Sequence, residues 1–257
     1  MQRLAPELLR YLPAVTVVAL ISFSACASPD EIPIGSNILL ITIDTLRADH
    51  LSSYGYERTT SPVIDKLAAE GIRFDQASVQ WPKTGPSFAS IFTATYPKNN
   101  GIVRKVGIPL PQEFRMLAEE LKANGYGTHA VVANGAVSAD FFFDQGFDTY
   151  VESWRVEEED GIDPTGAEAI NRRVLEVLPE IDRDKPFFLW VHYLDPHFPY
   201  TPPGEWSDLF QDDEYFDPSE KLLIDRTKNK IDMVKIGASQ ILDERDDRAF
   251  YVARYDA

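Results

Sequence analysis

The sequence predicts an α/β fold with a mostly parallel sheet. Three short apolar runs, at residues 38–43, 128–133 and 187–192, are rich in β-branched or aromatic residues and alternate with amphipathic, helix-like stretches. Strands that alternate with helices are typical of parallel sheets. The first run is continuously apolar and stops at Asp44, which is typical of a parallel strand covered on both faces.

Helices are predicted where turn-forming residues bound an apolar stripe of helical spacing. Residues 61–71 open with a Ser-Pro pair, which supplies an N-cap and a first helical residue, and end in glycine. Residues 111–125 open with proline and also end in glycine. Further helices are expected over about residues 166–180 and within residues 237–257. The proline-rich, acidic residues 199–230 predict a long surface excursion.

The 257-residue chain is strongly acidic, with 41 Asp and Glu residues against 25 Lys and Arg residues and a formal net charge of −16. This charge argues against a basic nucleic-acid-binding surface, so we expect no nucleic-acid partner. The single cysteine excludes an internal disulfide framework and a zinc site built from several cysteines.

The first 25 residues have the features of a secretory signal peptide. Arg3 and Arg10 flank the start of an apolar stretch over residues 12–23, and small residues follow it. The stretch is shorter than the roughly 20 residues of a membrane span, although an uncleaved anchor helix is the alternative. We expect residues 1–25 to be the signal peptide and residues 26–36 to form a tether.

The only cysteine, Cys26, lies where the predicted signal peptide ends. Residues 23–26, Phe-Ser-Ala-Cys, resemble the lipobox of bacterial lipoproteins, in which the cysteine is acylated and becomes the mature N-terminus. This resemblance implies an exported protein of the bacterial periplasm or cell envelope, held on the membrane by a lipid anchor at Cys26. Phe23 departs from the usual leucine, so simple cleavage after Ala25 or Ala27 is the alternative.

Polar residues follow all three predicted strands. Asp44 follows the first strand, Asn134 the second, and Asp195 and His197 come shortly after the third. Because ligands bind outside the carboxyl ends of the strands in open parallel sheets, we expect these residues at one edge of the sheet. Taken singly, each also fits an ordinary role in a turn.

Thr84 precedes a Gly-Pro pair that leads into a short predicted helix. Its hydroxyl is therefore expected at a helix N-terminus, where free N–H groups and the helix dipole favour an anion. A threonine in this position is most often only a helix cap. As a nucleophile it would need activation, which a bound divalent metal can supply, and Asp44 is a suitable hard-oxygen ligand for that ion.

Five ordered segments carry a recognisable pattern. They are NILLITIDTLRAD with LSSYGY over residues 37–56, SPVIDKLAAEG over 61–71, TGPS with TATYP over 84–97, LAEELKANGY over 117–126 and HYLDPHFPY over 192–200. In this order and spacing they resemble the sulfatase family of the alkaline phosphatase superfamily, over about residues 36–257.

The resemblance implies a three-layer α/β/α sandwich like that of alkaline phosphatase, with one or two divalent metal ions (Ca, Mg, Mn or Zn) at the carboxyl edge of the sheet. Asp44 is then a metal ligand, and Thr84 is both the nucleophile and a metal ligand. His197 matches the histidine that binds the ester or protonates its leaving group. Asn134 falls near a substrate-binding lysine and is expected to bind substrate, whereas His192 is expected to be structural. The partner is an anionic ester: a sulfated or phosphorylated glycan, lipid or small molecule.

The nucleophile region departs from the sulfatase pattern. Sulfatases proper carry a Cys or Ser that is oxidised to formylglycine and followed by an arginine. Thr84 cannot become formylglycine, Phe88 stands in place of the arginine, and Thr45 replaces the second acid of the usual Asp-Asp pair. A threonine is similar to the usage of the phosphodiesterase, phosphonate hydrolase and phospholipid headgroup transferase branches, which favours a phosphoester substrate.

A second departure concerns the family's later Asp-His or Asp-Asn metal-binding pair, which has no counterpart in this sequence. Residues 253–257 resemble the start of the helix that precedes that pair, so residues 37–257 are expected to be a catalytic domain without its C-terminal part. Three functions remain open at this point. They are a metal-dependent hydrolase of sulfate or phosphate esters, a phosphoester headgroup transferase, and a non-catalytic lipoprotein that binds an anionic ligand.

Overall fold

The computed structural model describes residues 35–103, 107–157, 161–210, 219–222, 224–225, 236–237, 242, 245 and 247–257. The chain separates into two units, residues 1–36 and residues 37–257. The predicted signal peptide and Cys26 lie outside the described residues. Among the helices that are described, none is long and apolar enough to cross a membrane.

The second unit is built on a four-stranded, fully parallel sheet. Its spatial order is β1 (Ile38–Ile43), β4 (Phe187–Tyr193), β2 (Gly127–Val132) and β3 (Thr149–Glu152). All three predicted strands are present, and in each the bounds differ from the prediction by no more than one residue. The predicted α/β class with a mostly parallel sheet is therefore confirmed.

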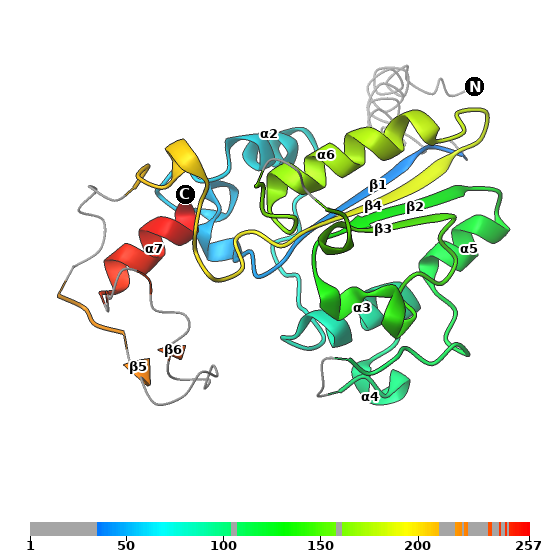
Figure 1. The fold of residues 1–257 in the computed structure, drawn as a ribbon, viewed down its shortest axis with the longest axis horizontal. Coiled ribbons are helices and arrows are strands. Elements are labelled where there is room, and N and C mark those ends of the chain that lie inside the picture. Colours follow the sequence, from blue (N-terminus) through cyan, green and yellow to red (C-terminus); the bar gives the residue numbers. More distant parts are fainter. Residues whose placement is uncertain are drawn as a thin grey trace, which may run out of the picture. The chain divides into compact units, whose positions relative to one another are not determined.

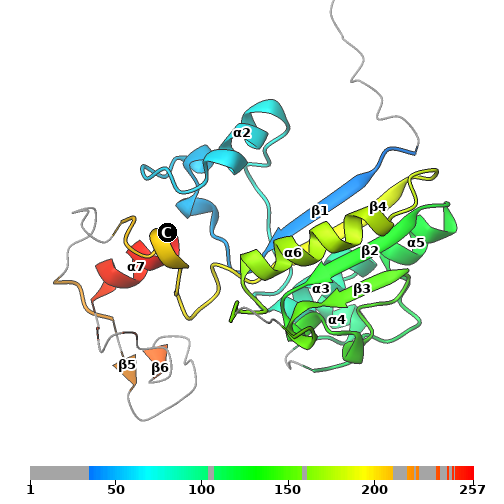
Figure 2. The same cartoon turned by 45° about the horizontal axis from the view of Figure 1, so that its top comes forward.

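Helices cover both faces of this sheet, as Figures 1 and 2 show. On one face, α3 (Thr84–Thr93) and α5 (Leu117–Ala123) pack against Ala130 and Val132 of β2 and Phe188 and Trp190 of β4. On the other face, α6 (Ala167–Val177) packs through Ile170 and Val177 against the alternate residues of the same strands. Because successive side chains of a strand point to opposite faces, one set of strands supports both layers, and the predicted three-layer sandwich is confirmed.

The α6 layer gives a direct test of this packing. Ile170 is fully buried in α6, whereas Leu175 of the same helix is 68% exposed. We expect Ile170→Ala to lower the free energy of unfolding by about 2–5 kcal/mol, because it removes buried methyl groups and leaves a cavity. Leu175→Ala should change it by less than about 0.5 kcal/mol. Denaturant unfolding of both variants checks this, and equal effects would contradict the observed orientation of α6.

β1 differs from the prediction in its burial. It pairs only with β4 among the described strands, and Leu39 and Ile41 are 58% and 50% exposed. The expectation that this strand is covered on both faces is wrong for the part of the chain that is described. A continuous apolar run shows that a strand can be buried, but its actual cover depends on the segments packed against it.

Two predicted helices differ in their ends. α2 (Pro62–Glu70) occupies the predicted place, but Ser61 makes no side-chain cap hydrogen bond and instead donates to Asp65 at 3.2 Å. The helix expected to begin at Pro111 begins at Leu117, because the Met116 N–H donates to the Glu119 carboxylate at 2.8 Å and so starts the helix there.

The remaining elements are short. α4 (Pro97–Asn100) follows α3, β5 (Ile224–Asp225) pairs with β6 (Ile236–Gly237), and α7 (Arg248–Asp256) lies within the predicted C-terminal helical region. Of the predicted surface excursion, residues 199–210, 219–222 and 224–225 are described, and residues 199–210 are mostly exposed.

α7 contacts the loop that follows β1. Its Tyr255 hydroxyl donates to the Thr45 carbonyl at 2.8 Å and accepts from the Arg47 N–H at 2.9 Å. Its Asp256 carboxylate accepts from Arg58 at 2.7 Å and is paired with His50 at 2.6 Å. These bonds hold the segment immediately after Asp44 against α7.

The Tyr255 contact predicts a pH dependence at the alkaline end. Burial raises the pKa of Tyr255 to about 12, above its usual value of 10. Its stabilising effect is therefore complete below pH 10 and is lost as the pH rises towards 12, because the unfolded chain releases the proton first. We expect Tyr255→Phe to be less stable than wild type at pH 8 and the difference to shrink between pH 10 and 12. A difference that stays constant would contradict the assignment.

Candidate functional site

Asp44 is the centre of the candidate site. It directly follows β1, and its N–H donates to the Tyr193 carbonyl at 2.9 Å, which continues the pairing of β1 with β4 by one residue. Its Oδ2 accepts hydrogen bonds from the Thr84 hydroxyl at 3.1 Å and from the Asn134 amide at 2.6 Å. The structure thus brings together residues that are 40 and 90 positions apart along the chain.

Thr84 is the first residue of α3, and it does not act as a helix cap. The residue before it, Lys83, has extended backbone and occupies the N-cap position without a side-chain cap bond. The Thr84 hydroxyl points instead to the Asp44 carboxylate. Helix α3 is fixed beneath the site because Phe88, Ala89 and Phe92 are buried in the core, so the position of the hydroxyl is set by packing.

Asn134 lies just after β2 and uses both ends of its side-chain amide. Its Nδ2 donates to Asp44 Oδ2, and its Oδ1 accepts from the Ala136 N–H at 2.9 Å. These two bonds connect the β2 loop to the carboxylate. Asn134 was predicted at this site because it is a polar residue directly after a strand. That Asn134 binds substrate stays a prediction.

A cavity of about 740 Å³ opens beside Thr84 at the carboxyl edge of the sheet. Thr84, Asn134 and His197 line it together with Lys83, Trp154 and Thr165, among others. His197 Nδ1 lies 2.8 Å from the Phe198 carbonyl, so Nδ1 carries the proton and Nε2 is the free ring nitrogen. Three of the lining residues were not predicted from the sequence: Lys83, Trp154 and Thr165. Of these, Lys83 could have been predicted, because it directly precedes Thr84.

Asp195, predicted at the same edge, is directed elsewhere. Its Oδ2 accepts from the N–H of Ala167, the first residue of α6, at 2.8 Å. Burial is the main cause that raises the pKa of Asp195. Its carboxylate therefore acts in the structure as a partner for the α6 N-terminus.

His192 of β4 lies beneath Asp44 and is fully buried. Its Nδ1 is 3.1 Å from the Thr42 hydroxyl, and its Nε2 is 3.8 Å from Asp44 Oδ2. Burial lowers the pKa of His192 to about 4, against the opposing effect of Asp44, so the ring is neutral near pH 7. The sequence placed His192 correctly in the strand but did not show that it faces Asp44.

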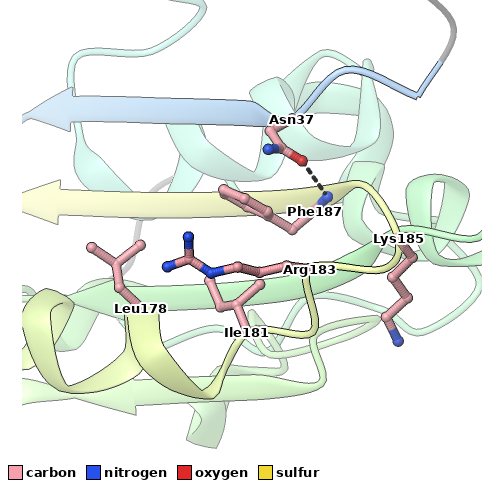
Figure 3. A pocket seen from close by; sticks show the side chains of 6 residues that line it. All are labelled: Asn37, Leu178, Ile181, Arg183, Lys185 and Phe187. Carbon is pink, nitrogen blue, oxygen red and sulfur yellow. Dashed lines mark hydrogen bonds between the residues drawn. The ribbon is translucent and has the colours of Figure 1, made fainter.

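A second, smaller pocket of about 300 Å³ lies at the opposite edge of the sheet, where the strands begin (Figure 3). Asn37 directly precedes β1, and Phe187 is the first residue of β4. The Asn37 side chain accepts from the Phe187 N–H at 3.1 Å. The exposed Arg183 and Lys185 form part of its lining. The pocket shares no residue with the site at Asp44.

The donor set at Asp44 fits a divalent ion only in part. Asp44 and Thr84 offer two oxygen ligands, and the buried His192 Nε2 has no hydrogen-bond partner. No group of three His, Cys, Asp or Glu side chains that could hold a metal occurs within the described ranges. The described residues therefore provide part of a metal site.

A protein in the alkaline phosphatase superfamily from Vibrio parahaemolyticus has a similar fold, with a TM-score of 0.52 at 20% identity over 86% of this chain and 48% of its own. The Sulfatase family model matches residues 36–253. This chain belongs to the sulfatase family.

Among curated relatives, the N-acetylglucosamine-6-O-sulfatase of Bacteroides thetaiotaomicron is 25% identical over 79% of this chain and 38% of its own length. The uncharacterized sulfatase YidJ of Escherichia coli is 28% identical over 72% of this chain and 43% of its own. The chain thus spans less than half of either relative.

Solved structures show the same fold. BT4656, in complex with its substrate D-glucosamine-2-N,6-O-disulfate, has a TM-score of 0.61 at 24% identity, over 72% of this chain and 40% of its own. The phosphonate monoester hydrolase of Agrobacterium radiobacter has a TM-score of 0.56 at 22% identity, over 74% and 46%.

Proposed function

We propose that this chain carries the nucleophile of a sulfatase-type hydrolase that cleaves sulfate or phosphate esters, with Thr84 in place of formylglycine. One observation carries the proposal: the hydroxyl of Thr84, which lines the cavity and opens α3, donates to Asp44 Oδ2 at 3.1 Å. Membership of the sulfatase family supports the reaction class.

In the proposed reaction, Thr84 Oγ1 attacks the sulfur or phosphorus atom, and Asp44 Oδ2 is the acceptor nearest to its proton. The N–H groups of Thr84 and Gly85 bind the non-bridging oxygens of the ester, because they precede the first bond of the helix, which Ser87 donates to the Lys83 carbonyl at 3.0 Å. Pro86 has no N–H. The ester oxygen leaves in line. When the His197 ring carries a proton on Nε2 as well as on Nδ1, its Nε2–H holds or protonates that oxygen. Water then cleaves the ester formed on Thr84.

Asp44 and Thr84 are the residues that would hold the divalent ion that the family resemblance implies. When bound, such an ion supplies positive charge that favours ionisation of the nucleophile and balances charge on the ester oxygens. Asn134 keeps Asp44 in place for this role through its 2.6 Å hydrogen bond.

The substrate of the proposal is an anionic ester whose leaving group lies in the cavity against Trp154 and Phe198. BT4656, whose structure contains a sulfated sugar, shares the fold, which supports sulfur as the central atom of the ester. A phosphonate monoester hydrolase also shares the fold, which supports phosphorus. A threonine nucleophile favours the phosphoester, because formylglycine chemistry is not open to Thr84.

Export and lipid attachment at Cys26 belong to the same proposal. They are supported by the order of basic, apolar and small residues before Cys26 and by the fold shared with the C-terminal periplasmic domain of EcEptC, at a TM-score of 0.60. Incorporation of a labelled fatty acid that disappears in Cys26→Ser tests the anchor, and a label that persists would contradict it.

The central experiment compares an aryl sulfate with an aryl phosphodiester, using the purified chain with added divalent metal. We expect turnover of at least one ester, with the phosphodiester preferred. Adding an alcohol acceptor separates hydrolysis from transfer, because a transferase would form the alcohol's ester instead of releasing the free acid. Binding of the ester without turnover would contradict the proposed hydrolase and would favour a non-catalytic anion-binding protein.

A further inference from the structure

His192 carries a buried nitrogen atom that no hydrogen bond satisfies. The residue is fully buried near the end of β4, and its Nε2 has no partner among the described residues. The ring lies between Phe88 of α3, at 4.9 Å between centroids, and Trp190, at 5.9 Å. An unsatisfied polar atom in such apolar surroundings is costly and requires an explanation.

The other ring nitrogen is held by Thr42. In the parallel pairing, Thr42 of β1 lies opposite His192, and its hydroxyl is 3.1 Å from His192 Nδ1. The same hydroxyl accepts from the Trp190 indole N–H at 2.9 Å and has the Val191 carbonyl at 3.4 Å as an acceptor for its own proton. In the tautomer in which the Thr42 hydroxyl donates to Val191, Nδ1 donates to Thr42 and Nε2 carries no proton.

The unprotonated Nε2 therefore faces a carboxylate oxygen. Asp44 Oδ2 is 3.8 Å from Nε2, which is beyond hydrogen-bonding range, and both atoms are acceptors. A cation between them resolves this, because metal–nitrogen and metal–oxygen bonds of about 2.0–2.2 Å each can span that separation. A metal-bound histidine ordinarily donates its second N–H to a fixed acceptor, which is the position that Thr42 occupies.

We propose that His192 Nε2 is a nitrogen ligand of a divalent ion that also binds Asp44 and Thr84. The inference rests on the proposed function for the presence of an ion at Asp44, and it adds a ligand and a preference to that site. A set of one imidazole nitrogen and two oxygens suits Zn²⁺, Mn²⁺ or Co²⁺ better than Ca²⁺ or Mg²⁺.

Metal titration of the purified, chelator-stripped chain tests the inference. We expect Zn²⁺ and Co²⁺ to bind at least about 10-fold more tightly than Ca²⁺, and we expect His192→Gln to lose at least about 10-fold of the Zn²⁺ affinity while Ca²⁺ binding changes little. His129→Gln is the matched control, because His129 is also buried in the sheet but on β2, with its Nδ1 unpartnered. Its Zn²⁺ affinity should equal that of wild type.

X-ray absorption of the zinc-loaded wild-type chain covers the case in which His192→Gln does not fold. An imidazole in the zinc coordination shell supports the inference, and a shell made of oxygen alone overturns it. Unchanged zinc affinity in a folded His192→Gln variant, or no divalent ion bound by wild type, also overturns it. Turnover of an ester with unchanged metal preference in His192→Gln would refute only the inference, whereas metal binding through His192 without any turnover would refute only the proposed function.

Discussion

Replacing Thr84 with alanine is expected to lower the turnover of an aryl ester by at least about 10³-fold, because the variant has no hydroxyl to form the covalent ester. The fold should be retained, since the side chain is not part of the hydrophobic core and, among the described residues, its hydroxyl bonds to Asp44. Initial rates at saturating substrate, measured beside the thermal unfolding midpoint, check both statements.

Two controls define this result. Thr84→Ser keeps a hydroxyl at the first residue of α3 and should keep measurable turnover. Thr93→Ala removes a hydroxyl at the other end of the same helix, where it bonds to the Ala89 carbonyl, and should leave turnover near the wild-type rate. The same initial rates are compared for Thr84→Ala and wild type. A rate for Thr84→Ala within 10-fold of the wild-type rate would refute Thr84 as the nucleophile.

Asp44→Asn is expected to have the second largest effect. The substitution preserves shape but removes the negative charge that accepts from Thr84 and Asn134 and that would bind a cation. We expect divalent-metal affinity to fall by more than about 100-fold and turnover to fall with it, because a neutral amide is a far weaker ligand for a divalent ion than a carboxylate. Isothermal titration with the metal and steady-state rates measure the two effects separately.

Asp49→Asn is the matched control for Asp44→Asn. Asp49 lies five residues further along the same loop, and its exposed carboxylate pairs with Arg47 at 2.5 Å. Its loss should affect neither metal affinity nor turnover by more than a few-fold, because exposed ion pairs contribute little. Equal metal binding by wild type and Asp44→Asn would show that Asp44 is not a ligand.

Much of the fold could be predicted from local pattern. The runs that form β1, β2 and β4 are short, apolar and separated by helical stripes, so their positions and parallel pairing followed from periodicity and connection rules. The exposure of Leu39 and Ile41 could not be predicted, because it depends on what lies beside β1 and not on the strand's own residues. The late start of α5 depends on the hydrogen bond that the Met116 N–H donates to the Glu119 carboxylate.

The candidate site was predictable to the extent that strand ends determine it. Asp44 and Asn134 each follow a strand, and the carboxyl ends of parallel strands lie at one edge of a sheet. In the structure, Asn134 Nδ2 is 2.6 Å from Asp44 Oδ2 at that edge. His192 was harder to interpret, because a histidine inside an apolar strand also suits the core. Its relation to Asp44 arises from the β1–β4 register, in which Thr42 and His192 are partners, and register requires the tertiary structure.

Identification of the covalent intermediate tests the central claim most directly. The chain is incubated with an aryl phosphodiester or aryl sulfate and divalent metal, quenched in acid during steady-state turnover, digested and analysed by mass spectrometry. The account predicts an adduct on the Thr84 side chain, either a phosphodiester that keeps the substrate's second ester group or, from the aryl sulfate, a sulfuryl ester. No such adduct is expected in Thr84→Ala. An adduct on a different residue, or turnover in which Thr84 is never modified, would contradict it.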